Sequence, residues 1–560
     1  MSTSNTPPAP PRGAAAPRSA TAPATRPNLV LIMTDTQGVN VLGAYAEQEQ
    51  RRRGAENAPA RAALRTPCLD RLAAQGITFD RCYTTTPLCT PARAGLFTGR
   101  YSHSVGAWAN NLALAQNAPH MGQRFRDAGY RTAYTGKWHL DGHDYHGNGA
   151  CPDGWDERFW YDGMRYQADL SDADLAFWRQ GQRTIEALRA HGVTPEFTWG
   201  HRVADRAIGF LEEAAGQSQR PFLLVASFDE PHGPFTCPPE YAEPFRDFRY
   251  PVGPAAGDDL RDKPRYQQAW AAASRQGRGR GPGVLTSPPL YFGCNSFADG
   301  EIGRLVDAVD RLAPDNTWIV FTSDHGDMLG AHGLQSKACA VYEEIAHIPL
   351  LVRPPRASAP PADRPAPRTA PPGTRVPTLA SHIDVLPTFL DLAGLPVPPA
   401  LEGTSLAPVL HGEPGDPDRA VFVEYHRFAA QGEANGGFNP MRAIVKGNHK
   451  LAVNLLDRDE LYDLGADPTE CRNLIEDPAS AGLRDALHDQ LIDWQHAVRD
   501  PFRGPAWERR PWRRRPPRLT HGGGWRGERL GRDDGYAAPY TQEDPFAVRR
   551  WRGPTTEPAS

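Results

Sequence analysis

The sequence predicts an α/β protein in which a mostly parallel sheet lies between helices, followed by a smaller C-terminal unit. Three short, unbroken apolar runs are typical of strands buried on both faces of a parallel sheet, namely Asn28 to Thr34, Pro221 to Phe228 and Thr317 to Thr322. Between them, apolar residues recur at helical spacing, as at Val203, Ala207, Ile208 and Leu211, and at Ile302, Leu305, Val306, Val309 and Leu312. Because 560 residues exceed the usual size of one hydrophobic core, we expect a second unit.

The composition argues against several classes of partner. The 62 basic and 66 acidic residues leave a formal net charge of -4, which gives no electrostatic basis for binding nucleic acid or a membrane surface. The eight cysteines are scattered singly, so we expect reduced thiols rather than a zinc site or a disulfide framework. No apolar run is long enough for a membrane span, and the segment from Met1 to Pro27 lacks the apolar core of a secretory signal. We therefore expect a cytoplasmic protein.

Segments of biased composition divide the chain. We expect a disordered tail at 1–26, a large domain at 27–415 with a Pro-rich surface loop at 354–377, a small subdomain at 416–500, and an Arg-, Trp- and Pro-rich tail at 501–560. The tryptophans of the C-terminal tail need an apolar surface, which the body of the protein or a second copy of the chain would supply. A homo-oligomer formed through this tail is therefore one expectation.

Each apolar run ends at a polar cluster. Asp35 follows the first run, Asp229 to His232 follow the second, and Ser323, Asp324 and His325 end the third. Because the carboxyl ends of parallel strands meet at one edge of a sheet, we expect these side chains to face a common crevice. A single acidic strand end is more often a helix N-cap, but three together favour a functional site.

A long motif indicates the chemistry. The segment from Cys89 to Arg100 reads C-T-P-A-R-A-G-L-F-T-G-R and resembles the signature of the sulfatase family, the formylglycine-dependent type I sulfatases of the alkaline-phosphatase-like superfamily. The resemblance implies that a formylglycine-generating maturation enzyme oxidises Cys89. In the hydrated aldehyde one hydroxyl attacks sulfur and the other later helps to expel sulfate. The structural alternative is a buried thiol at the start of a helix.

The resemblance continues through most of the body of the chain. G-Y-R-T at 129–132 and G-K-W-H-L at 136–140 resemble the second sulfatase signature, which implies that Lys137 contacts a sulfate oxygen and that His139 orients the formylglycine. Arg93, by the same resemblance, holds the formylglycine hydroxyl.

Two residues further along match family positions that contact the substrate. His232, within E-P-H-G-P, matches a histidine that can protonate the leaving oxygen, for which a reference pKa of about 6.5 is suitable. Lys337 matches the lysine that binds sulfate or the leaving group.

The resemblance also implies a divalent metal bound by Asp35, Asp324, His325 and the formylglycine at position 89. Thr36 stands where many sulfatases have a second aspartate and is included among the metal-site residues, and Gln37 is an alternative source of oxygen. Calcium is the family default, while magnesium and manganese stay open because one carboxylate fewer lowers the charge offered to the ion.

Segments near the C-terminus complete the expected fold. Arg442 to Lys450 and Glu460 to Leu464 resemble the small antiparallel sheet that follows the alkaline-phosphatase-like large domain, with its packing helix.

The predicted activity is hydrolysis of a small-molecule sulfate ester, a sulfuric ester hydrolase reaction. A phosphonate monoester or phosphodiester hydrolase on the same site is the alternative, because the diol and the metal also suit phosphoryl transfer. A binding protein that has lost turnover, and an enzyme that uses unmodified Cys89 as a thiolate nucleophile, are the remaining hypotheses.

Overall fold

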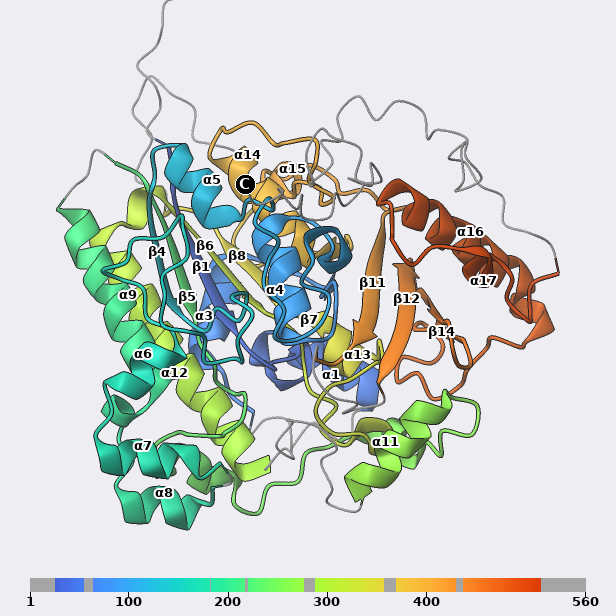
Figure 1. Ribbon diagram of the computed structural model, residues 1–560, viewed down its shortest axis with the longest axis horizontal. Helices are drawn as coiled ribbons and strands as arrows, with labels where there is room; N and C mark the ends of the chain where they lie inside the picture. The colour runs from blue at the N-terminus through green and yellow to red at the C-terminus, as the bar shows by residue number, and fades with distance from the viewer. Residues whose placement is uncertain are drawn as a thin grey trace, which may run out of the picture.

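The computed structural model describes residues 26–54, 64–181, 183–216, 220–275, 288–356, 369–429 and 437–514. Its centre is a seven-stranded sheet in the order β4-β5-β1-β6-β8-β2-β9, in which only β8 runs against the others (Figure 1). The mostly parallel sheet is therefore confirmed, and the predicted runs agree with β1, β5 and β6 to within one residue at each end. The strands are β1 Asn28–Thr34, β2 Ile77–Phe79, β4 Arg131–Gly136, β5 Phe222–Ser227, β6 Thr317–Ser323, β8 Leu350–Arg353 and β9 Thr374–Val376.

Helices cover both faces of this sheet (Figure 1). Val30 and Ile32 of β1 belong to a core shared with α3, α9 and α12, whereas Leu29, Leu31 and Met33 belong to a core shared with α4, α5 and α14. Successive side chains of a strand point to opposite faces, so a strand covered on both sides needs an unbroken apolar run. The six helices are α3 Pro67–Gln75, α4 Cys89–Thr98, α5 Met121–Asp127, α9 Trp199–Ala215, α12 Pro288–Leu312 and α14 Val385–Leu392.

Short elements complete the large domain. A small sheet has the order β10-β3-β7, formed by Ala380–Ser381, Cys82–Tyr83 and His347–Ile348. The remaining helices of this part are α1 Ala46–Arg53, α6 Gly163–Ala168, α7 Asp172–Arg179, α8 Ile185–His191, α10 Pro239–Ala242, α11 Arg265–Arg275, α13 Glu343–Ala346 and α15 Ala407–Leu410. All eight cysteines are free thiols, as expected. Within the described ranges no helix combines the length and apolarity that crossing a bilayer requires.

A separate antiparallel sheet follows toward the C-terminus, in the order β11-β12-β13-β14 (Figure 1). One face, including Val423 and Ala443, packs on Tyr83 and Leu88 of the large domain. The other face packs on α16, where Leu451 shares a core with α16 residues such as Leu487. The predicted small sheet with its helix is confirmed; its elements are β11 Ala420–Arg427, β12 Phe438–Lys446, β13 His449–Asn454, β14 Glu460–Asp463, α16 Ala481–Ala497 and α17 Pro505–Glu508.

Parts of three expected segments lie outside the described residues: 1–25 of the N-terminal tail, 357–368 of the Pro-rich loop and 515–560 of the C-terminal tail. The described start of the C-terminal tail packs on the body of the protein. Trp507 is buried in the core beside α16, and Trp512 Nε1 donates a hydrogen bond to Asp459.

A buried ion pair joins the small sheet to the large domain. His103 Nδ1 lies 2.5 Å from Glu424 Oε2 on β11, and both side chains are almost fully buried. Burial lowers the pKa of His103, but the charge of Glu424 raises it more, and the resulting pKa is about 9. The native state therefore binds this proton more tightly than the unfolded chain does. This stabilisation is complete below pH 6.5 and is lost as the pH rises to about 9.

We expect the free energy of unfolding of the wild type to fall by about 3 kcal/mol more than that of His103→Gln between pH 6 and pH 10. Denaturant unfolding of both proteins at the two pH values checks this. Titrating groups other than His103 contribute to both proteins, so their effect cancels in the difference between the two free energies of unfolding. Equal pH dependence in the two proteins would show that His103 is not protonated in the native state.

Candidate active site

The carboxyl ends of the parallel strands bring the predicted site together. Asp35 follows β1, Asp324 and His325 follow β6, and Lys137 follows β4. Cys89 enters from the first residue of α4, a helix whose residues are all buried. These residues are far apart in the chain, and they meet at the edge of the sheet where the carboxyl ends of the parallel strands lie.

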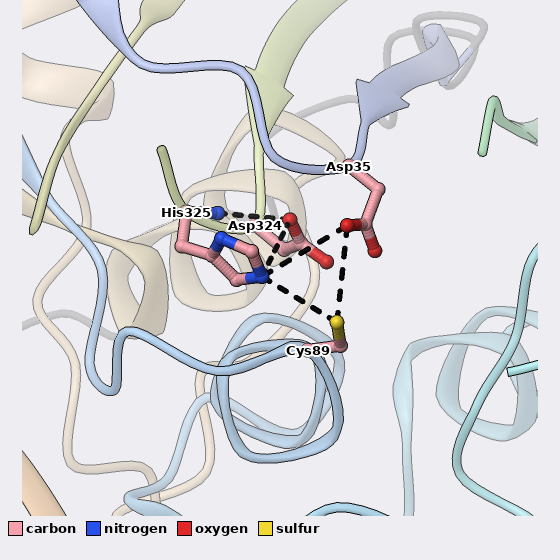
Figure 2. Close-up of side chains that lie close together, drawn as sticks. All are labelled: Asp35, Cys89, Asp324 and His325. Atoms are coloured by element: carbon pink, nitrogen blue, oxygen red, sulfur yellow. Dashed lines mark hydrogen bonds and ion pairs between the residues drawn. The ribbon is translucent and has the colours of Figure 1, made fainter. Parts of the chain in front are cut away.

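Four buried side chains form a cluster whose donor atoms all lie within 4.8 Å of one another (Figure 2). Cys89 Sγ lies 3.4 Å from His325 Nε2 and 3.8 Å from Asp35 Oδ1, and His325 Nε2 lies 3.6 Å from Asp324 Oδ1. Two carboxylates, an imidazole and the group at position 89 form a donor set that can hold a divalent ion. All of the metal ligands expected from the resemblance except Thr36 belong to this cluster.

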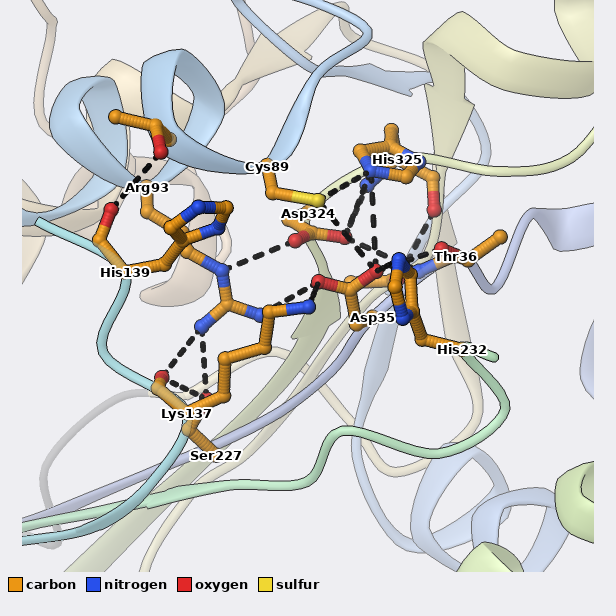
Figure 3. Close-up of polar contacts among 12 residues, drawn as sticks. Asp35, Thr36, Cys89, Arg93, Lys137, His139, Ser227, His232, Asp324 and His325 are labelled. Atoms are coloured by element: carbon orange, nitrogen blue, oxygen red, sulfur yellow. Dashed lines mark hydrogen bonds and ion pairs between the residues drawn. The ribbon is translucent and has the colours of Figure 1, made fainter. Parts of the chain in front are cut away.

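Arg93 fixes both carboxylates of the cluster (Figure 3). Its guanidinium donates to Asp35 Oδ2 at 3.1 Å and to Asp324 Oδ2 at 3.0 Å, and its third nitrogen donates to Lys137 O and Ser227 Oγ. The resemblance predicts a hydrogen bond from Arg93 to the hydroxyl of the group at position 89. In the structure every guanidinium nitrogen is instead directed to the carboxylates and to the ends of β4 and β5, so Arg93 holds the Oδ1 atoms of Asp35 and Asp324 toward the cluster.

Lys137 lies between two carboxylates, with Nζ 2.7 Å from Asp35 Oδ2 and 2.9 Å from Asp229 Oδ1. The turn that brings Lys137 inward requires Gly136, whose φ is 107° and whose added Cβ would lie 1.9 Å from Ser227 O. Asp229 is one of the strand-end residues expected to face the crevice, but the resemblance gives it no role in catalysis or metal binding. In the structure it is the second counter-ion of Lys137.

Lys337 and His139 approach Cys89 from different loops. Lys337 Nζ lies 2.8 Å from Cys89 Sγ and 2.9 Å from His325 Nε2, although the sequence alone could not separate it from a solvated surface lysine. His139 has a left-handed backbone with φ of 57°, and its Nε2 bonds to Asn111 Oδ1 at 2.9 Å. The sequence offered no signal for the role of Asn111.

His232 lies beside Asp35 at the periphery of the cluster (Figure 3). Its side chain is 18% exposed, Nε2 is 4.0 Å from Asp35 Oδ1, and Nδ1 is 3.8 Å from Asp229 Oδ1. The ring of Tyr145 packs beside it at 5.3 Å between centroids. Since the four residues of the cluster are almost fully buried, His232 is the group best placed to meet a molecule that enters from solvent.

The charges of the site perturb its acids in opposite directions. Burial raises the pKa of Asp35, but Lys137, Lys337, His232 and Arg93 together hold it well below the usual range. Burial and the neighbouring charge of Asp35 raise the pKa of Asp324 to about 6.

The pKa of the Cys89 thiol is shifted in the same direction as that of Asp35. Burial and the Asp35 charge raise the pKa of Cys89, but the charges of Lys337 and Lys137 outweigh them and lower it well below its usual range. The site therefore favours a negatively charged group at position 89.

Thr36 and Gln37 are both buried next to the cluster, but their polar groups already have partners. Thr36, with φ of 65°, donates from Oγ1 to Asp35 Oδ1 at 2.6 Å and from its backbone N–H to Asp324 Oδ1. Gln37 Oε1 accepts from Thr34 and its Nε2 donates to Asn295. In the structure Thr36 supports the two aspartates, and the polar groups of the Gln37 side chain are engaged by other residues.

Comparison with known proteins identifies the family. The model of the sulfatase family matches residues 27–395, and that of the N-sulphoglucosamine sulphohydrolase C-terminal region matches residues 330–497. The chain is 44% identical over 489 residues to the uncharacterized sulfatase YidJ of Escherichia coli K12, covering 87% of this chain and 91% of that protein. It is 30% identical over 435 residues to the choline-sulfatase of Rhizobium meliloti, covering 74% and 78% of the two chains.

Solved structures share the fold. BT4656, in complex with its substrate D-glucosamine-2-N,6-O-disulfate, superposes with a TM-score of 0.64 at 23% identity over 85% of this chain and 99% of that chain. The phosphonate monoester hydrolase SpPMH of Silicibacter pomeroyi superposes with a TM-score of 0.65 at 21% identity over 84% and 96%. Together with the family match over most of the large domain, these findings show that the chain belongs to the sulfatase family of hydrolases.

Proposed function

We propose that this sulfatase cleaves a small-molecule sulfate monoester by means of a formylglycine made from Cys89 and a bound divalent metal. The observation that carries the proposal is the surroundings of position 89. Within the described residues, side chains from strand ends and from loops converge on the first residue of α4, which begins the maturation signature; they are Asp35, Lys137, His139, Asp324, His325 and Lys337.

The residues of the chain have distinct tasks in this proposal. A metal held by Asp35, Asp324, His325 and position 89 supplies Lewis-acid chemistry when it is bound. Lys137 and Lys337 place two ammonium groups beside the reacting group, where they offset the negative charge that develops on sulfate in a site without bulk water. Arg93 keeps the metal-binding carboxylates oriented.

Two histidines handle protons. His139 is held through Nε2 by Asn111, its Nδ1 has no hydrogen-bond partner among the described residues, and this nitrogen can take a proton from a hydroxyl at position 89. His232, the more exposed ring, can donate a proton to the leaving oxygen of the ester. The maturation enzyme that installs formylglycine is the second partner that this mechanism requires.

The names of two relatives support a small sulfated substrate. One relative is a choline-sulfatase and one structural neighbour binds a sulfated glucosamine. These names support the ester class and do not identify the alcohol that this enzyme releases.

A specific observation favours phosphonate monoester hydrolysis as the second candidate. His325 contributes a nitrogen donor, and the chain has Thr36 where a further carboxylate would add charge. A metal site with less negative charge attracts a different range of anionic groups.

Turnover of matched esters separates the two candidates. We would measure kcat/KM of the formylglycine-containing enzyme for 4-nitrophenyl sulfate and 4-nitrophenyl phenylphosphonate, with calcium, magnesium or manganese. Our proposal requires the sulfate ester to be preferred with at least one of these metals. A consistent preference for the phosphonate would establish the second candidate, and no turnover of either ester by fully converted enzyme would leave a binding protein.

The calcium affinity of Thr36→Asp tests whether position 36 faces the metal, so that a carboxylate there would add a ligand. Aspartate tolerates the left-handed backbone at this position and would place another carboxylate beside Asp35. We expect calcium to bind at least about tenfold more tightly than in the wild type, because a hard cation gains a charged oxygen ligand. Isothermal titration with calcium checks this, with Thr36→Asn as the neutral control of the same shape. Equal affinities in Thr36→Asp and Thr36→Asn would mean that position 36 does not face the ion.

A further inference from the structure

We propose that the folded chain in which Cys89 has not been converted is a thiolate metal site for a borderline-soft divalent ion such as Zn²⁺ or Co²⁺. The ligands are Cys89 Sγ, His325 Nε2 and the Oδ1 atoms of Asp35 and Asp324. This site differs from that of the mature hydrolase, in which the sulfur has been replaced by oxygen.

The distances between the donors suit a four-coordinate ion. Sγ lies 3.4 Å from His325 Nε2 and 3.8 Å from Asp35 Oδ1, while Nε2 lies 3.6 Å from Asp324 Oδ1 and 3.9 Å from Asp35 Oδ1. Tetrahedral zinc, with about 2.3 Å to sulfur and about 2.0–2.2 Å to nitrogen and oxygen, separates its ligands by about 3.3–3.6 Å. Four of the six donor pairs are thus within a few tenths of an ångström of these separations, and all six pairs lie within 4.8 Å.

The neighbouring hydrogen bonds orient each donor toward the ion. His325 Nδ1 bonds to the carbonyl of Gly326 at 2.9 Å, which places the ring proton on Nδ1 and the lone pair on Nε2, inside the cluster. Arg93 takes the Oδ2 atoms of both aspartates, so that both Oδ1 atoms lie toward the cluster (Figure 2), where each also accepts a hydrogen bond from Thr36. A ligand set with this outer support is preformed for binding.

The chemistry of the sulfur decides which ion is favoured. Calcium and magnesium take oxygen ligands, whereas a thiolate combined with an imidazole selects zinc and similar ions. Cys89 is only 2% exposed, so a folded chain does not present this thiol to another protein. Molecules that fold before conversion therefore keep the sulfur ligand.

Lys337 competes with the ion for the same donors. Its Nζ lies 2.8 Å from Sγ and 2.9 Å from His325 Nε2, and thus donates to two of the four ligand atoms. An ion that binds both atoms must displace this ammonium group and then lies beside its charge. We therefore expect Lys337→Met to bind the ion at least about fivefold more tightly, the opposite of what loss of a merely structural residue would produce.

The test is Co²⁺ titration of the full-length protein, produced without a maturation enzyme, stripped with chelator and shown by intact mass to retain the Cys89 thiol. We expect one ion per chain, an intense near-ultraviolet band from thiolate-to-cobalt charge transfer, visible bands of tetrahedral intensity, and loss of all of these on addition of Zn²⁺. The charge-transfer band should be absent in Cys89→Ser and unchanged in Cys471→Ser, the control for a half-buried thiol outside the cluster. His325→Asn should weaken binding by more than about tenfold.

The formylglycine-converted wild-type protein also lacks sulfur at position 89. If Cys89→Ser does not fold, this converted protein serves as the control for the charge-transfer band. No charge-transfer band in the thiol form, or the same band in a sample without sulfur at position 89, would overturn the proposal. Unchanged affinity in Lys337→Met would overturn the assignment of Lys337 as the competitor. The titration involves no turnover, so its result is independent of whether the converted enzyme hydrolyses sulfate esters.

Discussion

Cys89→Ala is expected to lower kcat for sulfate-ester hydrolysis by at least about 10⁴-fold while leaving the fold intact. The side chain supplies the nucleophile in the proposed mechanism, and no other cysteine among the described residues belongs to the cluster. Its removal leaves a small gap at the start of α4 and should cost about 1–2 kcal/mol of stability. Steady-state kinetics with a chromogenic sulfate ester, together with thermal unfolding, measure both effects.

Cys82→Ala is the matched control, because Cys82 is equally buried but lies in β3, outside the cluster. Its kcat should stay within about twofold of the wild type, since it removes a thiol without removing the nucleophile. Residual sulfatase activity in Cys89→Ala above about one hundredth of the wild-type rate would contradict the assignment of position 89.

Lys137→Met should lower kcat by about 10²–10³-fold and also destabilise the protein by about 3–5 kcal/mol. The two effects have one cause. The Nζ of Lys137 bonds both Asp35 and Asp229 in a fully buried site, and methionine keeps the length of the side chain but leaves two carboxylates without this cation. Sulfate-ester kinetics and denaturant unfolding report the two losses separately.

The double variant Lys137→Met/Asp229→Asn is the control for this interpretation. Neutralising Asp229 removes one of the two stranded charges, so the double variant should regain part of the lost stability without regaining activity. Recovery of both properties would mean that Lys137 serves only as a structural counter-ion.

The layered fold could be predicted because its strands are covered on both faces. Leu29 to Met33 must all be apolar to lie between two layers of helices, and the same constraint marks β5 and β6. The strands β2 and β9, at one end of the sheet, are only three residues long and have no comparable pattern.

The sequence predicts in part which residues come together in the site. Asp35, Asp324 and His325 follow strands of one sheet, so the topology itself brings them together. Their detailed connections could not be predicted from sequence, because the reach of Arg93 to both carboxylates depends on how α4 packs against the sheet. Asn111 has no pattern at all, since it acts through one side-chain contact from a loop.

The most direct test of the central claim is the mass of the tryptic peptide that contains residue 89, from protein produced together with a formylglycine-generating enzyme. Our account predicts the mass of the aldehyde at position 89, and turnover of a sulfate ester that rises in proportion to the converted fraction. An unmodified thiol at Cys89, in cells that convert a control sulfatase, or full conversion with no turnover of any sulfate ester, would contradict it.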